Sequence, residues 1–95
     1  MKKLPIDILD KINQDLSKPD DRELIIFLLE NLNVNERHRI MRCILFLAQG
    51  DMDIFGEYEK LAKIDYRDVI MNAEYEYPSE KRLRDFSKPF KEETT

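Results

Sequence analysis

The chain of 95 residues has no tryptophan, two glycines, one histidine and one cysteine, and these scarcities exclude several classes of protein. A turn-rich all-β fold needs more tight-turn residues than two glycines supply. The lone cysteine, Cys43, cannot form an internal disulfide, which favours a reducing compartment. Clusters of histidine and cysteine that would ligate a metal ion are missing, and no spacing resembles a calcium loop. We therefore expect no metal ion and no cofactor.

Long apolar stretches of the kind that cross a membrane are also missing. The longest apolar runs, Leu24–Leu29 and Ile44–Ala48, are far shorter than the roughly 20 residues that span a bilayer as a helix. Near the N-terminus, Asp7 and Asp10 interrupt the sequence before the apolar core of a signal peptide forms. We expect a soluble, cytoplasmic protein that has no membrane partner.

The charge pattern disfavours nucleic acid as a partner. The net charge is −4, whereas a surface that binds phosphates needs a clear positive excess. A helix-turn-helix around Gly50 would present Asp53, Glu57 and Glu59 outward from its second helix, and these charges repel phosphate. The basic cluster Arg37–Arg42 still leaves an alternative open, a regulator associated with nucleic acid.

Apolar residues at helical spacing, with clear start and stop signals, predict an all-α fold: a compact bundle of five helices. Prolines suit the first turns of two helices, a glycine stop is followed at once by an aspartate cap, and a second aspartate caps the last helix. The expected helices cover residues 5–16, 19–32, 36–49, a stretch after Asp51, and a stretch from Asp65 to Pro78. A short sixth helix over 79–86 is an option. Residues 1–86 then form a single helical domain, and residues 87–95 form a polar, flexible tail.

Two of the expected helices carry more apolar residues than one face can hold. The run Leu24–Leu29 sweeps past a full turn, so its members cannot all point at one core. A helical wheel places Leu24 with the inner residues but places Ile26 and Phe27 on either side of the outward glutamates. The run Ile44–Ala48 repeats the conflict, because Phe46 falls between two outward arginines. Exposing one phenylalanine forfeits about 1.5–3 kcal/mol relative to burying it.

Two explanations of this surplus remain open. Either the helix over 19–32 is central and its neighbours, with the tail, cover both faces, or the surplus forms a surface for another chain. We predict a small non-enzymatic protein-protein interaction module, a homodimer or an adaptor, that uses the helices over 19–32 and 36–49. A catalytically silent subunit of a larger complex is a third option. The predicted partner-binding residues are Ile26, Phe27, Glu30, Arg39, Arg42 and Phe46.

No residue pattern predicts catalysis. His38 and Cys43 lie five residues apart, about 140° around a helix, so they do not form a thiol–imidazole pair on one face. No phosphate-binding loop or nucleophile elbow is present. The segment 74–78, which alternates glutamate and tyrosine, is either an exposed docking patch or a helix end that packs Tyr77, and we favour the helix end. We predict that the protein is not an enzyme and has no catalytic or cofactor-binding residues.

Overall fold

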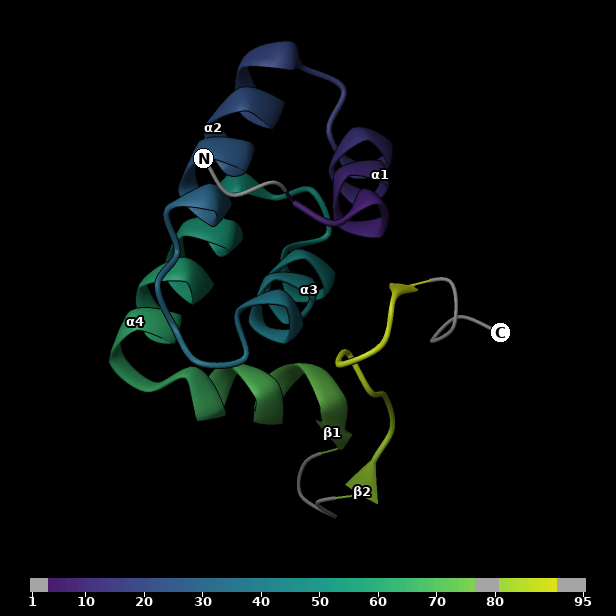
Figure 1. Ribbon diagram of the computed structural model, residues 1–95, viewed down its shortest axis with the longest axis vertical. Coiled ribbons are helices and arrows are strands. Elements are labelled where there is room, and N and C mark those ends of the chain that lie inside the picture. Colours follow the sequence, from purple (N-terminus) through teal and green to yellow (C-terminus); the bar gives the residue numbers. More distant parts are fainter. Residues whose placement is uncertain (1–3, 77–80, 91–95) are drawn as a thin grey trace.

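The computed structural model describes residues 4–76 and 81–90, and within them the chain is predominantly helical. This confirms the predicted all-α class (Figure 1). The expected number of helices is wrong, because the described part of the chain contains four helices and one small antiparallel hairpin. The elements are α1 (Ile6–Asp15), α2 (Pro19–Glu30), α3 (Arg37–Ala48), α4 (Met52–Glu74), β1 (Tyr75–Glu76) and β2 (Lys81–Arg82).

The missing fifth helix is the second half of α4. The backbone of Asp65 leaves helical geometry, with φ −152° and ψ 93°, yet the helix resumes on its far side. The Asp65 carboxylate accepts a hydrogen bond of 3.1 Å from the backbone N–H of Arg67, as a capping residue would. Figure 1 shows the result: α4 bends part-way along its length, and its second half crosses beneath α3. The sequence signal at Asp65 therefore marks a sharp kink, across which the two predicted helices run together as one element.

The turns between helices follow the local sequence. Pro19 occupies the first position of α2, and the Asp51 side chain accepts hydrogen bonds from the backbone N–H groups at the start of α4. Gln49 and Gly50 both have left-handed backbone geometry, with φ of 46° and 83°. At Gly50 the requirement for glycine is also steric, because a Cβ atom there would lie 2.7 Å from the carbonyl oxygen of Asp15.

The hydrophobic core is centred on α3. All residues from Ile40 to Leu45 are buried, including Arg42, so this helix is enclosed around most of its circumference. It packs most extensively on α4 and also contacts α1. The central helix is therefore α3, and not the helix over 19–32 that one of the two open explanations placed at the centre. Side chains from every helix complete the core, among them Ile8, Ile12, Ile25, Leu29, Phe55 and Val69.

Beyond α4, residues 75–76 and 81–89 are not helical. Residues 79 and 80 of the expected sixth helix lie outside the described residues, as does Tyr77. Residues 81–82 form β2, which pairs with β1, so the option of a sixth helix over 79–86 fails. Residues 81–90, which we call the strap, then run back across α3 toward α1 (Figure 1). Residues 87–90, assigned above to the tail, belong to this strap, and residues 91–95 lie outside the described part.

Candidate functional site

The structure divides the six predicted partner-binding residues into two groups of three. On α2, Phe27 is 60% exposed, while Ile26 and Glu30 are partly buried. The α3 group is engaged inside the molecule and is not a free surface. Its members are Arg39 and Phe46, both partly buried, and Arg42, which is buried.

Arg39 binds a carboxylate that lies wholly inside the protein, that of Glu74 at the end of α4. The guanidinium group makes two parallel hydrogen bonds to Glu74, of 2.8 and 2.7 Å. Arg82 of the strap adds two more, of 3.2 and 3.0 Å, and the backbone N–H of Phe86 donates at 3.1 Å. The carbonyl oxygen of Glu74 accepts from Leu83 at 2.6 Å. Glu74 therefore ties α3, α4 and the strap together.

The neighbours of Glu74 decide its ionisation state. Burial by itself raises the pKa of this carboxyl, but the hydrogen bonds from Arg39, from the Phe86 N–H and from Arg82 outweigh burial and lower it. The same contact raises the pKa of Arg39. The Cys43 thiol lies 3.7 Å from the carboxylate, and burial together with this negative charge raises its pKa. The thiol is therefore protonated and unreactive at neutral pH.

A second buried ion pair joins α1, α3 and the strap. Arg42 donates to both oxygens of Asp7, at 2.8 and 3.2 Å, and to the carbonyl oxygen of Phe86 at 3.2 Å. The backbone N–H of Phe90 donates to Asp7 at 3.2 Å. Burial raises the pKa of Asp7, but Arg42 and the Phe90 N–H more than compensate and lower it. Arg42 is thus a structural residue at the centre of the fold.

Aromatic side chains of the strap cover Phe46. The ring of Phe86 lies 5.2 Å from that of Phe46 and 5.6 Å from that of Phe90, centroid to centroid. The Arg84 guanidinium lies over the Phe46 ring at 4.4 Å. The sequence placed Phe46 on the outward side of its helix, which is correct, but the strap and not a partner covers it.

The arginines of α3 make most of their hydrogen bonds to other groups of the protein. Arg37 caps the C-terminal end of α2, donating to the carbonyl oxygens of Leu29, Glu30 and Leu32 at 2.9–3.0 Å. Arg39 binds the fully buried carboxylate of Glu74, and Arg42 binds the partly buried carboxylate of Asp7. Since these cations are paired internally, no observation on this cluster favours nucleic-acid binding.

The outer face of α2 is different, because nothing in the described structure covers it. Ile25 and Leu29 point into the core, which turns Phe27 directly outward. Leu24, which the helical wheel assigned to the inner face, is 48% exposed, and Ile26 packs partly against the core. The helix is therefore rotated relative to the expected orientation. Its exposed stripe consists of Asp20, Glu23, Leu24, Phe27 and Asn31.

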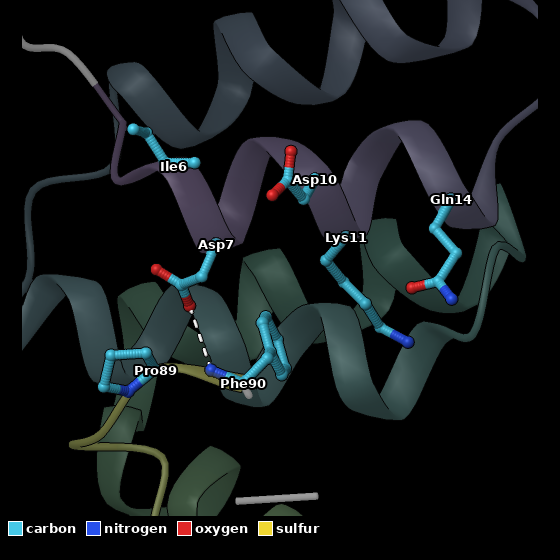
Figure 2. Close-up of a pocket in the computed structure, with 7 residues that line it drawn as sticks. All are labelled: Ile6, Asp7, Asp10, Lys11, Gln14, Pro89 and Phe90. Carbon is cyan, nitrogen blue, oxygen red and sulfur yellow. Dashed lines mark hydrogen bonds between the residues drawn. The ribbon is translucent and has the colours of Figure 1, made fainter. Parts of the chain in front are cut away.

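A groove of about 580 Å³ lies along α1 beside the end of the strap. Figure 2 shows Phe90 beside Asp7, with the Lys11 side chain extending past the ring. The Lys11 ammonium lies 5.8 Å from the ring centroid and 3.3 Å from Asp15. Asp7 is engaged by Arg42, and no serine, threonine, cysteine or histidine lines the groove. Its lining residues are Ile6, Asp7, Asp10, Lys11, Gln14, Pro89 and Phe90.

Within residues 4–76 and 81–90, no group of three or more histidine, cysteine, aspartate or glutamate residues could hold a metal ion. In the same ranges no helix is long and apolar enough to cross a membrane. No protein-family model, curated protein or solved structure matches the chain. Its function therefore has to be argued from its own geometry.

Proposed function

We propose that the protein is a non-enzymatic protein-protein interaction module that contacts its partner through the outer face of α2. The observation that carries the proposal is the exposed pair Leu24 and Phe27. These residues are three apart on a helix, so their side chains are neighbours on its surface. Aromatic residues are enriched at protein interfaces and supply much of the binding energy there.

The exposure of this pair is costly for the isolated protein. Burying a phenylalanine is worth about 1.5–3 kcal/mol, and the net stability of a domain is only about 5–15 kcal/mol. The apolar surplus of α3 shows how the chain removes such a cost, because Phe86 and Arg84 of the strap cover Phe46. No described segment does this for Phe27. A second protein chain that packed on α2 would cover Phe27.

The other exposed large apolar side chains do not form a comparable patch. They are Ile6, Ile64, Met71 and Leu83. Ile6 lies on α1, and Leu83 directly follows β2. Ile64 and Met71 lie on α4, on opposite sides of its kink. Isolated apolar residues are normal on a protein surface and indicate no binding site. We therefore confine the proposed contact to α2 and omit the three α3 residues.

A site-specific photo-crosslink tests the proposal. Phe27 is replaced by p-benzoylphenylalanine in the full chain, and the cells that produce it are irradiated. The matched control places the same group at Ile64, which is 83% exposed on α4. We expect a discrete protein adduct from position 27 that position 64 does not give. The adduct mass shows whether the partner is a second copy or another protein. Identical adducts from both positions, or none from position 27, would contradict the proposal.

A further inference from the structure

We infer that the α2 face takes a helix of a different protein, one whose apolar stripe is flanked by lysine or arginine. This inference rests on the proposed function and specifies the partner. Its basis is the spacing and the charge of the side chains that α2 presents to solvent.

The spacing matches the seam of a pair of packed helices. Asp20, Leu24, Phe27 and Asn31 are separated by four, three and four residues, and all four are exposed. A repeat of three and four places side chains along one line, where they interdigitate with those of a facing helix. The two apolar residues occupy the middle of this seam and the polar ones its ends. A facing helix with apolar residues at the same spacing would enclose Leu24 and Phe27.

The charge beside the seam is entirely negative. Glu23 and Glu30 are one heptad apart on one flank, and neither forms an ion pair with any described residue. The only base in α2, Arg22, turns back and donates to the carbonyl oxygens of Leu16 and Ser17. Charges that flank a helical seam determine which partner is accepted. Basic residues on the facing helix would pair with both glutamates.

A second copy of the chain fits this face poorly. Antiparallel pairing of α2 with itself would place Glu23 on the same flank as Glu30 of the other copy. Parallel pairing would instead bring the Asp20 side chains of the two copies together in the seam, and like charges across an interface oppose association. The same carboxylates repel nucleic acid and anionic lipid. The remaining match is a basic amphipathic helix.

The contact should be weak and reversible. α2 has 12 residues and is therefore about 18 Å long, which gives an interface at the small end of the specific range. Small interfaces of this kind are typical of transient complexes. Steering between opposite charges should speed association and make it sensitive to salt.

Three synthetic peptides test the inference on the full chain. Each has the same leucine seam over three heptads, with lysine, glutamine or glutamate on both flanks, and binding is followed by fluorescence anisotropy at low salt. We expect the lysine peptide to bind at least tenfold more tightly than the glutamine peptide, and the glutamate peptide not to bind. Phe27→Ser should weaken binding of the lysine peptide by about 30-fold, as for an interface hot spot. Glu23→Gln with Glu30→Gln should weaken it at least fivefold.

A charge-matched control separates the α2 face from the general acidity of the protein. Asp53→Asn with Glu57→Gln removes two exposed acidic charges from α4 and should leave binding within twofold. Equal weakening by both double variants would overturn the inference, as would lysine-peptide binding that is unaffected by Phe27→Ser. Equal binding of the glutamine and lysine peptides would leave the interaction function intact and refute the charge requirement. A wild-type dimer in analytical ultracentrifugation that Phe27→Ser dissociates would identify a second copy as the occupant and refute the inference. A discrete crosslink from position 27 with no peptide binding would refute only the inferred partner class.

Discussion

Replacing Glu74 by glutamine should destabilise the protein more than any other single neutralisation of an acid on α4. The carboxylate is fully buried and accepts six hydrogen bonds, two each from Arg39 and Arg82 and one each from the Phe86 N–H and the Cys43 thiol. A glutamine keeps the size but turns an N–H₂ group toward donors and leaves Arg39 with only the exposed Glu36, at 3.0 Å, as a counter-charge. Removing one partner of a buried ion pair costs about 3–5 kcal/mol. We expect the lower end, about 3 kcal/mol, because the Arg82 side chain is 42% exposed and regains water.

The measurement is urea unfolding followed by circular dichroism at 222 nm, with Glu59→Gln as the matched control. Glu59 is also a buried glutamate of α4, but its one recorded partner is the exposed Lys63 at i+4. Pairs of that kind contribute about 0.3–0.5 kcal/mol. The wild type, both variants and their m-values are compared, so that a change in the denatured state is recognised. If Glu74→Gln cost no more than Glu59→Gln, Glu74 would not be the residue that holds the strap.

Three other variants or conditions follow from the same contacts. Phe27→Ser should change the free energy of unfolding by less than about 0.5 kcal/mol in the same urea assay, because surface substitutions rarely do more; a loss near 3 kcal/mol would show that Phe27 belongs to the core. Gly50→Ala should destabilise by about 1 kcal/mol or more, since the site has positive φ and no room beside Asp15, and a neutral thermal melt would contradict this. The pKa values of Asp7 and Glu74 lie below their ordinary values of 3.8 and 4.5. The stability that these two carboxylates give the folded protein is therefore complete above about pH 5, and it is lost as the pH falls through the lowered pKa values. The free energy of unfolding, measured from pH 7 to 3, should therefore decline less steeply in Glu74→Gln than in the wild type. Parallel curves would show that Glu74 does not contribute to the loss of stability in acid.

Local signals in the sequence predicted the helices well. Pro19 opens α2, Gly50 and Asp51 separate α3 from α4, and the disturbance at Asp65 falls at the predicted residue. These features depend on a few neighbouring residues, so they can be recognised without knowledge of the rest of the fold. The local sequence marks the break at Asp65 but does not give the direction in which the helix continues beyond it.

The position of the strap could not be predicted in the same way, because the ion pairs that hold it join residues far apart in the sequence. Arg39 meets Glu74, and Arg42 meets Asp7, across 35 residues each. Hydrophobic patterning assigns charged residues to the surface, so it placed both arginines outside. One signal was available: Phe86 and Phe90 stand out in an otherwise polar segment, and both pack against the core. Such isolated aromatics suggest that a tail is docked, although they do not show where.

The strap also explains why the apolar surplus of α2 stays exposed while that of α3 does not. The outer face of α3 offers cations, Arg39 and Arg42, and carboxylates on α1 and α4 neutralise them as the strap closes over Phe46. The charged groups on the outer face of α2 are all carboxylates. Covering it requires a segment that brings its own cations, because a carboxylate desolvated without a partner costs more than the apolar contact returns. The strap's arginines are already engaged at Glu74, Ala73 and Phe46. The basic helix that we infer as the partner would meet this requirement.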